Sequence, residues 1–174
     1  MGFPGGRDVT EQLNPRVAVY TGTFDPVHRG HLDVISRGGL LFDKLIVAIG
    51  VNPDKATLFG TDERADLVRQ VTRDFPNVEV RTFDGLAVRF VRQCGARIMV
   101  RGLRTLSDME YEFTMSLMNR HLDPGIDTVF LMANEEFSHV SSSLLRQIAK
   151  FGGDLGKFLP EPVNAALVSK IRGG

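Results

Sequence analysis

Two histidines three residues apart follow a short apolar run near the start of the chain, in the segment 21–31 (TGTFDPVHRGH). Gly22 permits a tight turn and a close approach of the backbone to a ligand. A helix is expected to begin after this turn, and the N–H groups and dipole of a helix N-terminus favour an anion. Imidazole N–H groups also donate to phosphate oxygens, so His28 and His31 favour a phosphate site. Metal binding and simple helix capping are the alternatives, although no third ligand cluster lies nearby and zinc usually takes three or four protein ligands.

Cationic and hydroxyl side chains follow three further apolar runs. Lys55 follows the second run, Arg101 and Arg104 follow the fourth, and the serines 141–143 follow the fifth. Guanidinium groups make forked contacts to phosphate, and serines at a helix start offer hydroxyls and amides. Taken singly, these residues are explained equally well by a solvated lysine, surface ion pairs and a helix N-cap. Their shared position after apolar runs points to one common site.

Alternating apolar runs and helical patterns predict an α/β fold, a doubly wound five-stranded parallel sheet with C-terminal helices. Strands separated by helices pair in parallel because a parallel neighbour needs a crossover, and continuous apolar strands need helices on both faces. The expected strands are 17–20, 45–49, 78–83 (nearer an edge), 98–100 and 128–132, and the expected helices are 30–42, one starting after an N-cap at Thr61, 86–93, an amphipathic 107–121, 141–150 and 161–171. Such sheets bind ligands at the carboxyl ends of their strands, where the strand order reverses.

Length and composition exclude several classes of protein. The 174 residues suit one domain, and 21 Lys+Arg against 21 Asp+Glu lack the basic excess of a dedicated nucleic-acid binder. The single cysteine, Cys94, favours a reducing compartment. No apolar run reaches the roughly 20 residues of a membrane helix, and the N-terminus lacks the apolar stretch of a signal peptide. We therefore expect a soluble cytoplasmic protein with a flexible leader at 1–15 and a single domain at 16–174.

Familiar nucleotide and hydrolase motifs are missing from the sequence. No Gly-x-Gly-x-x-Gly follows the first strand, which disfavours a dinucleotide redox cofactor. The segment 152–158 (GGDLGKF) differs from a P-loop because it has no Ser or Thr after its lysine and follows a helix. No nucleophile elbow or Ser-His-Asp pattern is present either.

The segment 22–31 resembles the T/HxGH signature of the HxGH nucleotidyltransferase superfamily, and the serines 141–143 resemble its second phosphate-binding motif. Four further segments narrow the resemblance to the bacterial phosphopantetheine adenylyltransferases: 101–104 (RGLR), 108–112 (DMEYE), 118–122 (MNRHL) and 158–160 (FLP). The resemblance extends from about residue 16 to residue 170.

This resemblance implies a Rossmann-like nucleotidyltransferase fold and reversible transfer of an adenylyl group from ATP to 4′-phosphopantetheine. The products are dephospho-coenzyme A and pyrophosphate, in the penultimate step of coenzyme A synthesis. It further implies Mg²⁺ carried with ATP and not held by protein side chains, a homohexamer, and coenzyme A as a candidate feedback inhibitor. Nucleic acid and membrane partners are not expected.

Residue roles also follow from the resemblance. Thr23, His31, Lys55 and Arg104 are the expected catalytic residues, with Lys55 contacting both the attacking phosphate and the α-phosphate of ATP. The expected ATP-binding residues are Thr23, Phe24, His31, Gly102, Leu103, Arg104, Glu112, Phe137, Ser138, His139, Val140, Ser141, Ser142 and Ser143. The expected phosphopantetheine-binding residues are Thr23, Lys55, Ala87 and Arg101. Family members often carry Pro where Thr21 stands and Trp where Phe137 stands, departures that bear on nucleotide packing.

The residue types indicate how the reaction proceeds. The nucleophile is already an ionised phosphate, so catalysis requires positioning and stabilisation of negative charge by cationic groups and amides, by in-line attack without a covalent intermediate. A related transferase acting on nicotinate mononucleotide or glycerol phosphate is an alternative, which the segments 101–104 and 119–122 disfavour. A non-catalytic nucleotide-binding module is another, although cations aimed at the α-phosphate from two sides favour an enzyme. A metalloprotein that binds its metal through the His-x-x-His pair is a third alternative.

Overall fold

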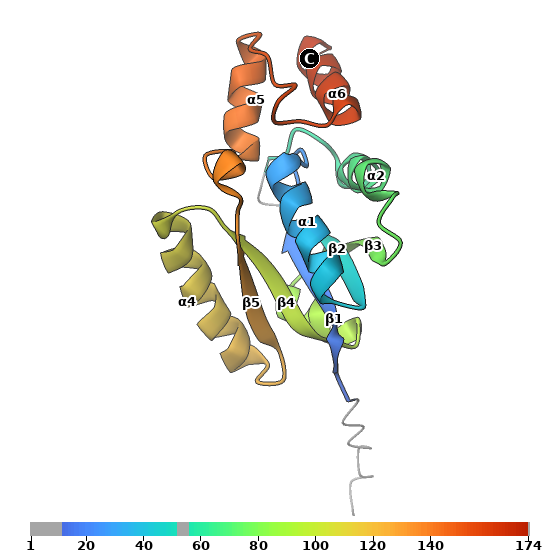
Figure 1. The fold of residues 1–174 in the computed structure, drawn as a ribbon, viewed down its shortest axis with the longest axis vertical. Coiled ribbons are helices and arrows are strands. Elements are labelled where there is room, and N and C mark those ends of the chain that lie inside the picture. Colours follow the sequence, from blue (N-terminus) through green and yellow to red (C-terminus); the bar gives the residue numbers. More distant parts are fainter. Residues whose placement is uncertain (1–11, 52–55, 174) are drawn as a thin grey trace, which may run out of the picture.

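The computed structural model describes residues 12–51 and 56–173. Within them lies one five-stranded parallel sheet of strand order β3-β2-β1-β4-β5 (Figure 1). The strands are β1 (Asn14–Gly22), β2 (Lys44–Val51), β3 (Val78–Asp84), β4 (Ala96–Leu103) and β5 (Asp127–Met132). The alternating strand β3 lies at an edge, as its pattern predicted, and the α/β fold class is confirmed.

Helices cover both faces of this sheet, which makes it doubly wound. They are α1 (Arg29–Leu41), α2 (Thr61–Thr72), α3 (Ala87–Gln93), α4 (Leu106–Leu122), the 3-10 turn η1 (Glu135–Phe137), α5 (Ser142–Lys150) and α6 (Glu161–Arg172). The larger core packs α1 and α2 on one face, and the smaller core packs Val88 and Val91 of α3 against Val19, Ile46 and Met99 on the other. Helices α5 and α6 lie beyond the carboxyl ends of the strands (Figure 1). None of the helices described is long and apolar enough to cross a membrane.

The sheet extends further than the apolar runs predicted. Strand β1 begins at Asn14, whose N–H donates to the Gly95 carbonyl at 2.9 Å, so residues 14 and 15 of the expected leader belong to the sheet. Strand β4 continues through Arg101 and Gly102 because these residues pair with Phe130 and Leu131 of β5. Apolarity marks the buried centre of a strand, whereas hydrogen bonding to a neighbouring strand continues into polar residues at its end.

The N-terminus of α2 differs from the prediction by one residue. Gly60, not Thr61, is the N-cap, and the Glu63 carboxylate accepts the Gly60 N–H at 2.7 Å. Thr61 is the first residue within the helix, and its hydroxyl accepts a hydrogen bond from Arg64 at 3.1 Å.

Candidate active site

The strand order reverses between β1 and β4, and two adjoining cavities open beside their carboxyl ends. The first cavity measures about 300 Å³ and the second about 260 Å³. Thr21, Arg101 and Glu112 line both cavities, so the two spaces meet at these three residues. A doubly wound sheet is expected to bind its ligands at this reversal point.

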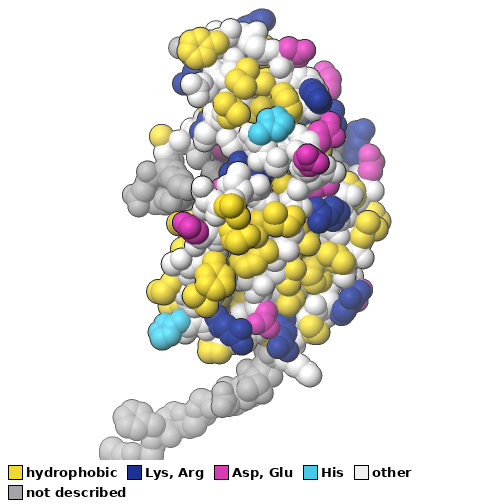
Figure 2. Space-filling view, turned by 60° about the vertical axis from the view of Figure 1, so that its left-hand side comes forward, with side chains coloured by type: hydrophobic (Ala, Val, Ile, Leu, Met, Phe, Trp, Pro, Cys, Tyr) yellow, Lys and Arg dark blue, Asp and Glu magenta, His cyan; other side chains and the backbone are white. Residues whose placement is uncertain are grey.

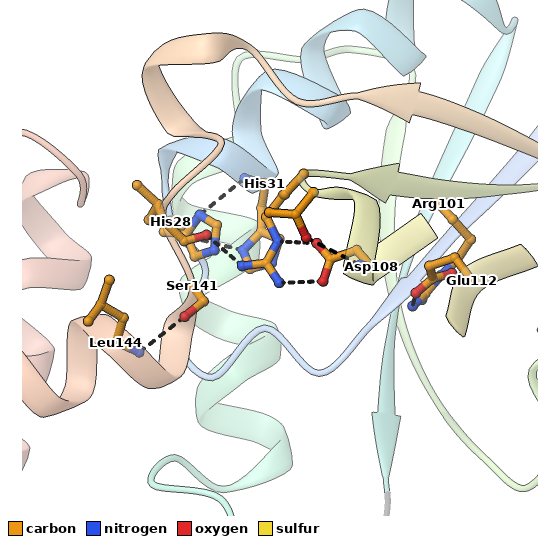
Figure 3. Close-up of polar contacts among 10 residues, drawn as sticks. His28, His31, Arg101, Asp108, Glu112, Ser141 and Leu144 are labelled. Carbon is orange, nitrogen blue, oxygen red and sulfur yellow. Dashed lines mark hydrogen bonds and ion pairs between the residues drawn. The ribbon is translucent and has the colours of Figure 1, made fainter. Parts of the chain in front are cut away.

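His28 and His31 fix each other at the start of α1. The His28 N–H donates to Nδ1 of His31 at 3.2 Å, and the His31 N–H donates to Nδ1 of His28 at 3.4 Å (Figure 3). Their rings stack with centroids 3.7 Å apart. Because Nδ1 of His31 accepts a hydrogen bond, its Nε2 carries the proton in the neutral ring and can donate to a ligand in the first cavity, which His31 lines.

Burial keeps both imidazoles neutral. Desolvation, assisted by the cationic Arg104, lowers the pKa of His28 from 6.5 to about 3. Desolvation also lowers the pKa of His31 well below its ordinary value, with smaller contributions from His28, Arg104 and Arg101. His31 is therefore a neutral hydrogen-bond donor near pH 7, and phosphate is the type of ligand that such a donor suits.

The turn between β1 and α1 is closely packed around Phe24. Phe24 has a φ of 51°, in the left-handed region, and its ring lies against Tyr20 at 5.4 Å and against His31 at 4.9 Å. A Cβ on Gly22 would lie 2.9 Å from this ring. A glycine is therefore required at position 22 for the Phe24 ring to pack against the ring of His31.

Two arginines at the end of β4 each pair with a carboxylate of α4. Arg101 binds Glu112 through two hydrogen bonds of 2.7 and 2.5 Å, and it also donates to the Thr21 carbonyl at 2.5 Å (Figure 3). Arg104 binds Asp108 at 3.0 and 3.3 Å and donates to the Val140 carbonyl at 2.8 Å. These contacts orient both guanidinium groups along the cavity wall.

The serines at the start of α5 close the first cavity opposite β4. Ser141 is the N-cap, and its hydroxyl accepts the Leu144 N–H at 3.2 Å. The Ser142 hydroxyl donates to the Pro26 carbonyl at 2.8 Å, which ties α5 to the turn after β1. Ser141, Ser142 and Ser143 all line the cavity, so the positive end of the α5 dipole lies beside it.

The second cavity has a more apolar lining and lies between α3 and α4. Its wall comprises Gly85, Leu86, Ala87, Met99, Tyr111, Met115, Ser116, Asn119 and Thr128, besides the three shared residues. Apolar side chains alternate here with hydroxyl and amide groups. This lining suits a slender ligand arm that combines methylene groups with amides.

Most predicted site residues gather at these cavities. Those lining the first are Thr23, Phe24, His31, Gly102, Arg104, Glu112, Phe137, Ser141, Ser142 and Ser143. Ala87 lines the second cavity and Arg101 lines both. Leu103, Ser138, His139 and Val140 do not line either cavity, although Val140 holds Arg104 through its carbonyl. Lys55 lies outside the described residues.

Sequence reasoning missed several lining residues. Asp108 lies four residues after Arg104, but Arg104 precedes α4, so the i,i+4 pairing of helices did not predict this contact. Tyr20 and Val34 are apolar wall residues without a chemical signature, and their position follows only from the packing of β1 and α1. Among the described residues, no three His, Cys, Asp or Glu side chains gather as metal ligands do.

Comparison with known proteins first defines the class. A family model described as cytidylyltransferase-like matches residues 19–148. The fold resembles the crystal structure of a protein from Vibrio parahaemolyticus described as a nicotinate-nucleotide adenylyltransferase, with a TM-score of 0.64 over 87% of this chain and 97% of the other, at 17% identity. The chain thus belongs to the cytidylyltransferase-like family and shares the fold of this solved structure.

Similar sequences define the particular family. The phosphopantetheine adenylyltransferase of Rhodopirellula baltica is 54% identical over 162 residues, covering 91% of this chain and 90% of the relative. That of Clostridium beijerinckii is 49% identical, covering 90% and 98%, and that of Caldanaerobacter subterraneus is 50% identical, covering 90% and 98%. The chain belongs to the phosphopantetheine adenylyltransferase family. The predicted family and enzyme class are confirmed, and the predicted function, adenylyl transfer in coenzyme A synthesis, is that of the family.

Proposed function

We propose that this enzyme transfers the adenylyl group of ATP reversibly to 4′-phosphopantetheine, producing dephospho-coenzyme A and pyrophosphate. The observation that carries the proposal is the pair of adjoining cavities that meet at Thr21, Arg101 and Glu112. The first cavity, whose lining includes imidazole, guanidinium and hydroxyl groups, suits a nucleoside triphosphate. The second suits a pantetheine arm whose phosphate points toward the junction, so the two reacting phosphates face each other there.

Each side chain then has a role that its position supports. His31 and Arg104 donate to the ATP phosphates, together with the amides at the start of α5 and the hydroxyls of Ser141 and Ser143. Arg101 holds the phosphate of phosphopantetheine, and Thr23 contacts phosphates on both sides of the junction. Lys55 is proposed from the family resemblance to contact the attacking and the α-phosphate.

The reaction needs little proton transfer. A phosphate oxygen of phosphopantetheine attacks the α-phosphorus of ATP in line, and the bond from that phosphorus to the bridging oxygen of pyrophosphate breaks. Negative charge grows on the α-phosphate oxygens and on the departing pyrophosphate. The neutral His31 donor and the fixed guanidinium groups stabilise this charge without reorganising.

Mg²⁺ is proposed to arrive with ATP. The two carboxylates of the first cavity, Asp108 and Glu112, are each paired with an arginine, so phosphate oxygens are the better ligands for the ion. Bound Mg²⁺ would neutralise charge on the triphosphate. Excess EDTA is then expected to stop turnover without lowering the midpoint of thermal unfolding.

We also propose a cytoplasmic homohexamer. Only Glu112 of α4 is buried within the chain, and hydrophobic side chains gather on the face shown in Figure 2. Those of α4 that are exposed are Leu106, Met109, Tyr111, Phe113, Met115, Leu117, Met118 and Leu122. Burial of this surface between subunits would remove a large apolar patch from water. The single cysteine supports a reducing compartment.

Coenzyme A is proposed as a feedback inhibitor, because it contains the same phosphopantetheine arm as the product and suits the same cavities. Inhibition competitive with phosphopantetheine would support this assignment.

The reverse reaction tests the proposed function. Dephospho-coenzyme A with pyrophosphate and Mg²⁺ is expected to yield ATP, detected with luciferase, whereas nicotinate adenine dinucleotide in its place is expected to yield none. ATP formation from the second compound alone would contradict the proposed acceptor.

Light scattering tests the assembly: a mass of six 19.3 kDa chains is expected, with dissociation in the variant Leu117→Glu. A monomeric unaltered protein would contradict the hexamer.

A further inference from the structure

A buried arginine outside both cavities joins the ends of β1 and β2. Arg64, in the first turns of α2, is 2% exposed. Its Nη1 donates to the Thr23 carbonyl at 2.7 Å and to the Gly50 carbonyl at 3.1 Å, and its Nη2 donates to the Thr61 hydroxyl at 3.1 Å. Arg64 does not line either cavity.

This arrangement is unfavourable as a purely stabilising contact. Burial lowers the pKa of Arg64, although the carboxylate of Asp25 opposes that effect. Its buried Nε has no hydrogen-bond partner in the part of the chain that the structure describes. A buried cation with an unsatisfied N–H is costly to bury, so a contribution to stability alone does not account for the buried guanidinium.

The contacts of Arg64 fall on the backbone of a residue at the reacting centre. Thr23 lines the first cavity, and its carbonyl is held by Arg64, which does not line that cavity. The next part of the turn is held by α5, since Arg146 donates to the Asp25 carbonyl and Ser142 donates to the Pro26 carbonyl. Among the described residues, Arg64 is the side chain whose hydrogen bond to the Thr23 carbonyl ties Thr23 to α2.

We infer that Arg64 is a positioning residue for adenylyl transfer, which acts by holding the Thr23 carbonyl and thereby setting where Thr23 meets the phosphates. The inference rests on the proposed function. Loss of this anchor displaces Thr23 in the transition state more than it weakens ground-state binding. A misplacement of ~1 Å costs about 100-fold in rate.

Steady-state kinetics of Arg64→Met test the inference, beside Leu67→Ala as a matched control. Leu67 is a buried apolar residue of the same helix that lines neither cavity. We expect kcat to fall about 10- to 100-fold in Arg64→Met while KM for ATP changes less than about threefold. Leu67→Ala is expected to lower the unfolding midpoint and keep kcat, measured where both variants are folded by circular dichroism.

A double-mutant cycle separates positioning from a general structural role. In a Thr23→Ala background, Arg64→Met is expected to lower kcat by less than about threefold, because its effect passes through Thr23. Arg64→Lys, which keeps one donor, is expected to recover part of kcat, and it serves in the cycle should Arg64→Met not fold. An equal kcat loss in Leu67→Ala, or full additivity with Thr23→Ala, overturns the inference. A lack of turnover in the unaltered protein contradicts the proposed function instead.

Discussion

Replacing His31 by alanine tests the role of its single available donor. Nδ1 of His31 is occupied by the His28 N–H, so only Nε2–H can reach a phosphate. One hydrogen bond is therefore lost at the α-phosphate or the departing pyrophosphate. The loss of one preorganised donor at developing negative charge costs about 10²- to 10³-fold in kcat, or ~2.7–4 kcal/mol. The assay is single-turnover formation of dephospho-coenzyme A, with His31→Gln as the control because its amide retains a donor.

The neutral state of His31 also predicts how kcat depends on pH. Burial lowers its pKa well below 6.5, so the ring does not titrate between about pH 6 and pH 8. Any change in kcat across that range is then expected to be the same in the unaltered enzyme and in His31→Gln. A fall in kcat near pH 6.5 that is absent in His31→Gln would contradict the neutral state of His31. Full single-turnover rates in His31→Ala would contradict its role as a donor to phosphate.

Three further perturbations follow from the contacts of the site. Glu112→Gln removes the charge that orients Arg101, so KM for phosphopantetheine is expected to rise about tenfold, ~1.4 kcal/mol, with a smaller change for ATP; an unchanged KM in initial-rate assays would contradict this. Gly22→Ala places a methyl group 2.9 Å from the Phe24 ring and is expected to lower the unfolding free energy by about 1–3 kcal/mol in denaturant titrations. Gly50→Ala, where a Cβ has ordinary contacts, is its control, and equal effects of both would count against the packing argument. The pKa of His28 is lowered to about 3 in the folded protein, so the unfolded state binds more protons below its ordinary value and stability falls as the pH drops. His28 is expected to account for about 2 kcal/mol of the stability lost between about pH 7 and pH 5, beside a further loss from His31, whose pKa is also lowered. A loss as large in His28→Gln as in the unaltered protein would contradict the assignment.

Residue types at strand ends predicted which side chains lie together at the cavities, because the carboxyl ends of parallel strands meet at one edge of the sheet. His31, Lys55, Arg101 and Ser141 follow four different apolar runs that were predicted as strands. Parallel pairing alone assigned them to the same edge of the sheet, where the strands have their carboxyl ends. Three of those positions do meet there, and Lys55 lies outside the described residues.

Contacts that depend on tertiary packing were not predictable. Helix capping by these histidines was one of the alternatives that the sequence left open, and His28 is indeed the N-cap of α1. Because a histidine is an unusual N-cap, the reciprocal hydrogen bonding between His28 and His31 could not be predicted. Glu112 pairs with Arg101 across a loop and two turns of α4, and only the placement of that helix brings them together. The apolar pattern of 107–121 predicted an amphipathic helix, yet its apolar side chains are exposed in the single chain. A helix pattern indicates a face that needs covering but not which surface covers it.

Pyrophosphate release from ATP and Mg²⁺, measured in parallel with 4′-phosphopantetheine, nicotinate mononucleotide and glycerol 3-phosphate, is the most direct test of adenylyl transfer to phosphopantetheine. We expect release with phosphopantetheine alone, together with dephospho-coenzyme A in the mass spectrum. Release with another acceptor and none with phosphopantetheine would contradict this expectation, as would ATP binding without release in any of the three reactions.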